Sequence, residues 1–143
     1  MDRRLADFNG IMKETDEIYG NIARRLGLSD GEFWILYTLR TETEPLTQTQ
    51  LGDVLHLPKQ TIHSALKKLE VQGLVAMAYA HDRRSKRVRL TAQGEAFARD
   101  TVDRVLVMEQ EALRGWSEEE HAALMELLRR YADRLRGQMD ALG

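Results

Sequence analysis

The middle of this 143-residue chain contains a short segment that could bind an anion. Residues 58–90 hold eight lysines and arginines and only two acidic residues, although the whole chain has a net charge of −2. Ammonium and guanidinium groups bind phosphate and carboxylate oxygens through charge-assisted hydrogen bonds. A basic segment in an otherwise acidic chain indicates an anionic partner that meets one surface; a solvated charged face is the alternative. The basic residues are Lys59, Lys67, Lys68, Arg83, Arg84, Lys86, Arg87 and Arg89.

The residue types that enzymes and metal sites use are absent or unsuitably spaced. The chain has no cysteine, which excludes disulfides, thiolate zinc sites and thiol nucleophiles. Its four histidines do not have the spacing of metal ligands, and the sequence has no glycine-rich phosphate loop and no G-x-S-x-G turn. We therefore expect no metal site, no cofactor and no enzymatic activity.

The basic segment begins in a predicted helix-turn-helix. A capping pair opens a short helix over residues 47–56, and Pro58 suits the first turn of a second helix over residues 58–72. The inner face of the second helix is Ile62, Leu66 and Leu69, and Gly73 ends it. Two short helices joined by a tight turn form a helix-turn-helix.

A two-stranded ribbon is predicted directly after these helices. Residues 74–79 are apolar, residues 81–86 are polar and charged, and residues 87–90 alternate between basic and apolar side chains. This pattern predicts a β-hairpin with a basic tip. A helix-turn-helix followed by such a wing is a winged helix, so the expected fold class is mainly α with a small β-wing (α+β).

Longer helices flank this winged helix, over residues 3–26, 29–40, 91–115 and 117–142, and capping pairs at Ser29–Glu32 and Ser117–Glu120 begin two of them. The first and last carry more apolar stripe than one small core can cover, which favours a homodimer. The longest apolar run, residues 74–80, is too short to cross a membrane, and the first residues contain no signal-peptide core. We expect a cytoplasmic protein with no membrane partner.

The chain resembles the MarR (multiple antibiotic resistance regulator) family of transcription factors over nearly its whole length. The wing carries the strongest match, an Asp-x-Arg at Asp82 and Arg84 followed by Leu90-Thr91-x-x-Gly94. Further matches are Leu51, residues 57–62, Leu69 and residues 73–75. The chain departs from the family at residues 76–78, which are apolar where members often carry charge.

The resemblance implies a single domain, 1–143, that binds double-stranded DNA as a homodimer. Residues 1–28 and 115–143 would be dimerisation helices, 29–92 the DNA-binding lobe and 93–114 a connecting helix. The second helix of the helix-turn-helix would enter the major groove, and the wing the adjacent minor groove. Many members also bind a small molecule between the dimer helices and the DNA lobe. Members that sense oxidants through a cysteine are no guide to this chain.

On these grounds we assign roles to the polar residues of the helix over 58–72. Side chains that hydrogen-bond base edges are the expected readers of sequence, and lysines are the expected phosphate contacts. An ordinary polar helix face is the alternative. The expected base readers are Gln60, Thr61, His63 and Ser64, and the expected phosphate contacts are Lys59 and Lys67.

In the wing, Arg84 resembles the family arginine that enters the minor groove, where negative potential is concentrated. Arg83 and Lys86 are expected to contact phosphates, and Asp82 to brace the turn. Arg87 and Arg89 share a strand face and could instead be structural ion-pair partners.

Aromatic residues lie on the helix over 29–40. Phe33, Trp34 and Tyr37 are a candidate pocket for an aromatic or amphipathic effector, and core packing is the alternative.

The sequence thus predicts a homodimeric DNA-binding regulator, a ligand-responsive repressor that acts on a pseudo-palindromic operator. A winged helix that binds proteins without DNA is the alternative.

Overall fold

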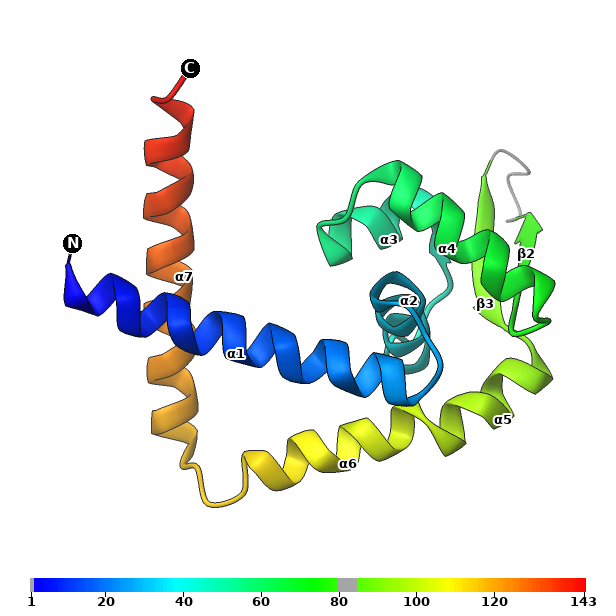
Figure 1. Cartoon of the computed structure of the whole chain (residues 1–143). Helices are drawn as coiled ribbons and strands as arrows, with labels where there is room; N and C mark the ends of the chain where they lie inside the picture. Colours follow the sequence, from blue (N-terminus) through cyan, green and yellow to red (C-terminus); the bar gives the residue numbers. More distant parts are fainter. Residues whose placement is uncertain (1, 80–84) are drawn as a thin grey trace. The chain divides into compact units, whose positions relative to one another are not determined.

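The computed structural model describes residues 2–79 and 85–143 (Figure 1). The chain divides into two compact units, Met1–Leu106 and Val107–Gly143. The helices are α1 (Arg3–Arg25), α2 (Asp30–Thr41), α3 (Gln48–Leu55), α4 (Lys59–Val71), α5 (Ala92–Asp100), α6 (Val102–Ala112) and α7 (Glu118–Asp140). The strands are β1 (Leu46–Thr47), β2 (Val75–Tyr79) and β3 (Lys86–Leu90). This content confirms the expected fold class, whereas the single domain over 1–143 stays a prediction.

Side-chain caps fix where the helices of the first unit begin. Ser29 Oγ accepts a hydrogen bond from the Glu32 backbone N–H at 3.2 Å, and Glu32 Oε1 accepts from the Ser29 N–H at 3.1 Å. Thr47 and Gln50 form the same reciprocal box at the start of α3. Such boxes satisfy backbone donors that the first turn leaves unpaired. The capping pairs seen in the sequence are therefore confirmed.

In the part of the chain that the structure describes, the sheet has three strands rather than the expected two. All pairs are antiparallel, in the order β1-β3-β2. The additional strand pairs Leu46 with Val88 and Thr47 with Arg87. Two residues are too few to show the alternation by which a strand is recognised, so the sequence predicted no strand there.

The core of the first unit lies between the helices and one face of the sheet. Its fully buried side chains come from α2 (Phe33, Ile35, Leu36), α3 (Leu51), α4 (Ile62, Leu66, Leu69), β3 (Val88) and α6 (Val102). The predicted inner face of the helix over 58–72 is thereby confirmed. Burial of this face leaves the opposite side of α4 in solvent.

The helix predicted over residues 93–114 is wrong in one respect, because it is broken at Thr101. This residue has φ −125° and ψ −75°, and it separates α5 from α6. Its buried hydroxyl donates to the Phe97 carbonyl at 2.7 Å. Thr15 and Thr38 make the same backward bond inside α1 and α2 without a break, so the bond accompanies the interruption at Thr101 and does not explain it. The apolar period continues through the break, so periodicity alone did not show it.

An ion-pair group centred on Arg40 of α2 spans the break. Arg40 Nε and Nη2 donate to the two Asp103 carboxylate oxygens at 2.8 and 2.7 Å. Arg40 Nη1 also lies 3.5 Å from a carboxylate oxygen of Glu95 in α5. The hydrogen bonds from Arg40 lower the pKa of Asp103, and the same bonds raise the pKa of Arg40. Arg40 thus holds the helices on both sides of Thr101.

The second unit is built on α7, which Ser117 and Glu120 begin with another capping box. Hydrogen bonds from Ser117, chiefly from its backbone N–H, lower the pKa of Glu120. No α7 residue is buried, and six large apolar side chains of residues 118–142 are exposed: Met125, Leu127, Tyr131, Leu135, Met139 and Leu142.

None of the helices in the described ranges is both long and apolar enough to span a bilayer.

Candidate nucleic-acid interface

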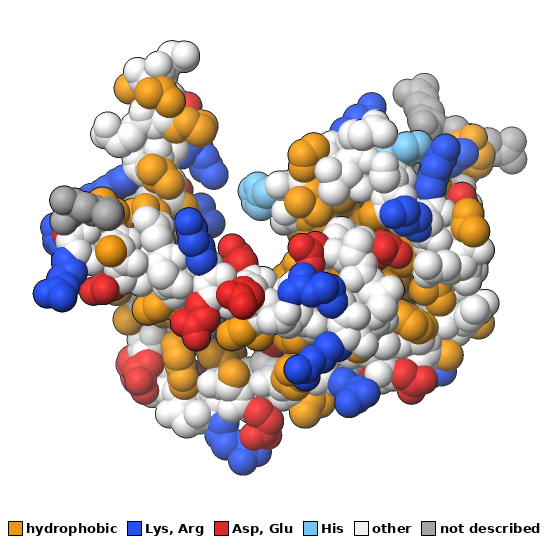
Figure 2. Space-filling view, in the orientation of Figure 1, with side chains coloured by type: hydrophobic (Ala, Val, Ile, Leu, Met, Phe, Trp, Pro, Cys, Tyr) orange, Lys and Arg blue, Asp and Glu red, His pale blue; other side chains and the backbone are white. Residues whose placement is uncertain are grey.

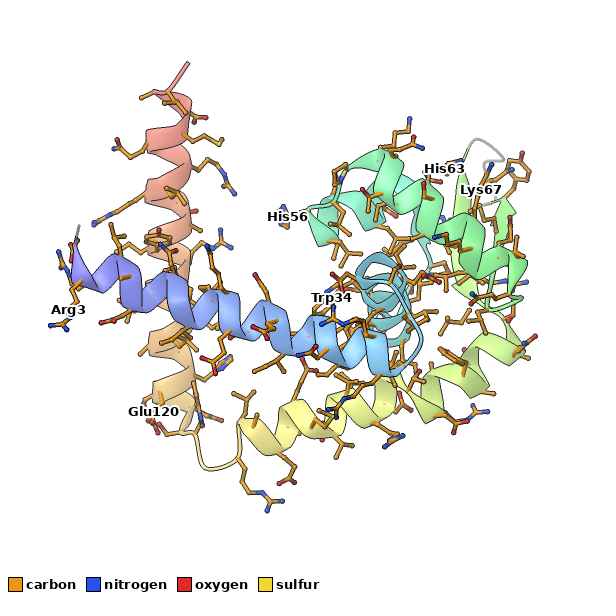
Figure 3. The ribbon with its side chains drawn as sticks, in the orientation of Figure 1. Arg3, Trp34, His56, His63, Lys67 and Glu120 are labelled. Atoms are coloured by element: carbon orange, nitrogen blue, oxygen red, sulfur yellow. The ribbon has the colours of Figure 1, made fainter. Side chains whose placement is uncertain are left out.

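The exposed side of α4 carries the residues that the sequence singled out. The six residues of α4 with an expected DNA contact are all exposed. Two of them, His63 and Lys67, can be followed on the ribbon in Figure 3. In the space-filling view, basic and histidine side chains lie over this helix (Figure 2). Glu70 is the helix's one carboxylate. We call this surface the α4 face; it consists of Lys59, Gln60, Thr61, His63, Ser64 and Lys67.

The helical repeat makes part of this face a straight line. Gln60, Ser64 and Lys67 are spaced i, i+4 and i+7, so they follow one another along one side of the helix. Amide and hydroxyl groups can pair with base edges, and the ammonium group can pair with phosphate. The arrangement can therefore combine recognition of bases with electrostatic attachment.

The turn before α4 presents the start of the helix to solvent. The C-cap of α3 is His56, which has a left-handed backbone with φ 53°. Pro58 then occupies the N-cap of α4 and makes no side-chain capping bond. The N–H groups of the first turn of α4 thus have no side-chain cap, and a helix N-terminus favours negative charge.

The base of the wing is tied to the end of α4 by Thr91. Its hydroxyl donates to the Gly73 carbonyl at 2.5 Å and accepts from the Gly94 backbone N–H at 3.0 Å. The Thr91 backbone N–H donates to the Leu74 carbonyl at 3.1 Å. These bonds join the turn between α4 and β2 to the start of α5, and they set the position of the wing beside the helix. The Leu90-Thr91-x-x-Gly94 match in the sequence is therefore a structural clamp.

The wing residues are only partly described. Asp82, Arg83 and Arg84 lie outside the described residues, so their expected roles stay predictions. Lys86 is exposed, and its ammonium nitrogen lies 5.3 Å from the centre of the Tyr79 ring. Sequence reasoning assigned no role to Tyr79; its position beside the basic tip, in a strand with no charged residue, was the available signal.

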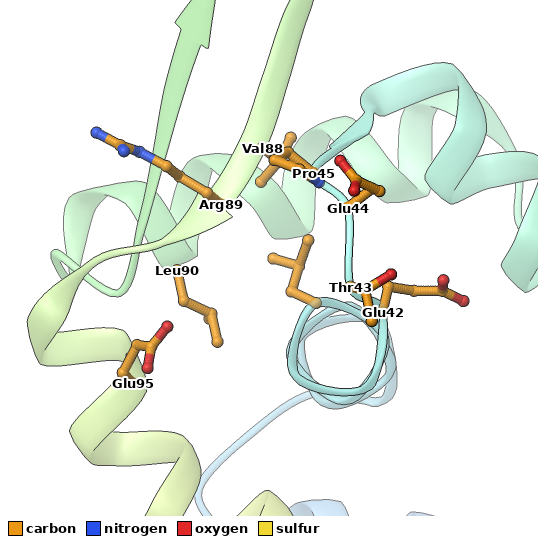
Figure 4. A pocket seen from close by; sticks show the side chains of 9 residues that line it. Glu42, Thr43, Glu44, Pro45, Val88, Arg89, Leu90 and Glu95 are labelled. Carbon is orange, nitrogen blue, oxygen red and sulfur yellow. The ribbon is translucent and has the colours of Figure 1, made fainter.

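Arg87 and Arg89 form no ion pair with the described residues. Arg87 Nη1 donates to the Pro45 carbonyl at 3.4 Å, which joins β3 to the connection before β1. Arg89 is exposed and lines a cavity of about 300 Å³ between the end of α2 and β3. Its guanidinium extends away from the Glu42 and Glu44 carboxylates that share the cavity (Figure 4).

A groove of about 450 Å³ borders the α4 face on the side of α2. Lys68, which was not among the expected contacts, lines it four residues after Ser64. The residues that line the groove are Ser29, Asp30, Gly31, Gln60, Thr61, Ser64, Ala65 and Lys68.

The three aromatic residues of α2 form a cluster with α1. Phe33 is fully buried, whereas Trp34 and Tyr37 are half-buried. The Trp34 ring centre lies 4.9 Å from that of Tyr19, 5.0 Å from Phe33 and 5.2 Å from Tyr37. Phe33 is part of the core, and Trp34 and Tyr37 have the accessible edges. An effector role for the three stays a prediction.

Among the described residues, no group of three or more His, Asp or Glu side chains is arranged to hold a metal ion.

Comparison with known proteins decides the family. The sequence model of the MarR family matches residues 26–85. The chain is 30% identical over 105 residues to the uncharacterized HTH-type transcriptional regulator YwoH of Bacillus subtilis, with 73% of this chain and 76% of that protein covered. The chain belongs to the MarR family. It is also 34% identical over 118 residues to the HTH-type transcriptional regulator PecS of Dickeya dadantii, with 80% and 71% covered.

A solved MarR structure has the same fold. The MarR family regulator NMB1585 from Neisseria meningitidis matches with a TM-score of 0.87 at 24% identity, and the match covers 100% of both chains. MarR family members are transcriptional regulators that bind DNA and act as dimers. The chain is therefore a winged-helix, DNA-binding transcriptional regulator, a class that generally works without catalysis.

Proposed function

We propose that the chain is a homodimeric repressor that binds a pseudo-palindromic operator and releases it when a small molecule binds. In each protomer α4 enters the major groove and the wing enters the adjacent minor groove. The observation that carries this proposal is the exposed line of Gln60, Ser64 and Lys67, which contains no carboxylate. Gln60, Thr61, His63 and Ser64 read bases, and Lys59, Lys67 and Lys86 hold phosphates. Arg83, Arg84 and Asp82 enter the proposal through the family resemblance.

Exposed apolar surface supports the dimer. On α1, four large apolar side chains are between 42% and 65% exposed: Leu5, Ile11, Met12 and Ile18. The six exposed on residues 118–142 add a second such surface. Contiguous apolar patches of this kind mark interfaces. A two-fold dimer would place its half-sites about one helical turn, ~10 bp, apart.

The DNA contact can be tested through its salt dependence. The slope of log K against log salt is negative, and each lost phosphate contact should make it less steep by about 0.9, or by ~1.8 for both protomers. We therefore expect Lys67→Ala to weaken binding and to flatten this slope. Lys13→Ala, which removes an exposed charge from α1, is the matched control and should leave both unchanged. Equal slopes for Lys67→Ala and wild type would contradict the role of the α4 face.

The effector role can be tested through Trp34. The chain has two tryptophans, so Trp116→Phe leaves Trp34 as the single emitter. Benzoate, as an aromatic probe, should quench that emission and weaken DNA binding over the same concentration range. Quenching without any change in DNA binding would show that the cluster binds aromatics but does not regulate. The alternative function, a protein-binding winged helix, predicts no DNA binding by the wild type.

A further inference from the structure

Tyr79 and Lys86 form the last described pair of the wing hairpin. They are direct partners in the β2–β3 register, after Val75–Leu90 and Met77–Val88. Residues two apart on a strand share a face, so all three pairs lie on the same side of the sheet. Val75 and Val88 bury that side in the core, beneath the helices. Tyr79 and Lys86 therefore continue the face of the wing that is turned toward the helices, beyond the end of the core.

The exposure of Tyr79 argues against a role in packing. Its side chain is 63% exposed, whereas Val88 on the same face is 0% exposed. Its ring is in cation–π contact with Lys86, at 5.3 Å from the ammonium nitrogen. No carboxylate among the described residues pairs with Lys86. Among the described residues, the Tyr79 ring is therefore the group that contacts this ammonium.

The other face of the wing differs in a way that provides an internal comparison. Arg87 and Arg89 pair in register with Ala78 and Ala76, on the side opposite Tyr79. Neither therefore shares a face with Lys86. Within the described strands, the helix side thus carries one cation in contact with an aromatic ring, and the other side carries two arginines.

We propose that Tyr79 is a positioning residue that holds Lys86 against the phosphodiester strand running between α4 and the wing. The inference rests on the proposed function: when α4 occupies the major groove and the wing the adjacent minor groove, the backbone between these grooves passes between the two elements. Lys67 contacts this backbone from α4, and Lys86 contacts it from the wing. The first wing strand, β2, has no charged residue. Tyr79 of β2 instead contributes to DNA binding by holding the ammonium group of Lys86 on β3.

The test measures binding of the full-length protein to the tightest duplex that the wild type recovers from a random-sequence pool. Affinities are measured from about 50 to 300 mM KCl, because the slope counts phosphate contacts. We expect Lys86→Ala to make the negative slope less steep by about 1.8 per dimer. Tyr79→Ala should weaken binding about two- to five-fold per protomer and flatten the slope in the same direction. Tyr79→Phe keeps the ring and should match the wild type.

Two further variants make the result decisive. The double variant Tyr79→Ala/Lys86→Ala should bind no more weakly than Lys86→Ala, since the ring acts through the ammonium. Arg89→Ala, on the other face, should leave the slope unchanged. Three results would each overturn the inference. The first is a double variant whose loss of affinity equals the product of the two single losses. The others are a loss in Tyr79→Phe equal to that in Tyr79→Ala, and an unaltered slope in Tyr79→Ala. A wild type that binds no duplex would overturn the proposed function as well, whereas normal wild-type binding with an inert Tyr79→Ala would overturn this inference alone.

Discussion

Gly94 gives a prediction in which helix propensity and packing have opposite signs. It lies in the first turn of α5, and replacing a helical glycine with alanine ordinarily stabilises a helix by about 1 kcal/mol. In this fold, however, a Cβ at Gly94 would stand 1.9 Å from the Leu74 carbonyl oxygen. That oxygen belongs to backbone, which cannot rotate away as a side chain can. Gly94→Ala should therefore destabilise the protein.

The size of this destabilisation follows from the hydrogen bonds that must break. Ordinary contact begins near 3.4 Å, so α5 and Leu74 must separate by roughly 1.5 Å. This movement would break the bond from Thr91 N–H to Leu74 O and the bond from the Thr91 hydroxyl to Gly73 O, now 3.1 and 2.5 Å long. Each hydrogen bond contributes about 1 kcal/mol net to the free energy of unfolding, and each carbonyl left without a partner adds a further desolvation penalty of about 1 kcal/mol or more. After the gain in propensity, we expect a net loss of about 3 kcal/mol.

The assay is urea unfolding at equal protomer concentration, because dimerisation makes apparent stability concentration-dependent. The matched control is Gly10→Ala, at an exposed position of α1 where a Cβ meets no atom within 4 Å. The control should gain up to about 1 kcal/mol. If Gly94→Ala were as stable as Gly10→Ala, the close seating of α5 on Leu74 would be wrong.

Two other changes test the ion-pair group and the dimer. Asp103→Asn should cost about 0.5–1 kcal/mol at pH 7, because the pair is partly exposed. Since Arg40 lowers the pKa of Asp103 in the folded state, this contribution is complete above the unfolded pKa of about 3.9 and declines as the pH falls through the folded value. A stability difference between wild type and Asp103→Asn that stays constant down to about pH 2 would exclude the carboxylate as its source. Ile11→Glu should shift the dimer toward monomer in sedimentation equilibrium, whereas Lys13→Glu should not, and equal behaviour of the two would argue against an interface on the apolar side of α1.

The sequence was most informative where local chemistry and tertiary structure agree. The capping pairs at Ser29, Thr47 and Ser117 and the buried period of α4 were readable because each depends on residues three or four positions apart. The fold class followed from them and from the alternation in β3. The exposure of the expected α4 residues followed as well, because burial of one side of a helix fixes the other side.

What the sequence did not reveal depends on partners far away in the chain. β1 exists because β3 pairs with it, and two residues carry no pattern of their own. The break at Thr101 leaves the apolar period intact on both sides, so periodicity does not mark it. The pairing of Arg40 with Asp103 joins residues 63 positions apart. The position of Tyr79 beside Lys86 required the register of the hairpin, which apolar composition alone does not define.

The central claim is that two copies of the α4 face recognise sequence in double-stranded DNA. The most direct measurement is to recover genomic fragments bound by the purified wild-type protein near physiological salt and to sequence them. We predict that the enriched fragments share an inverted repeat whose half-sites are centred about 10 bp apart. Fragments with no shared sequence, or a shared motif without two-fold symmetry, would contradict the account.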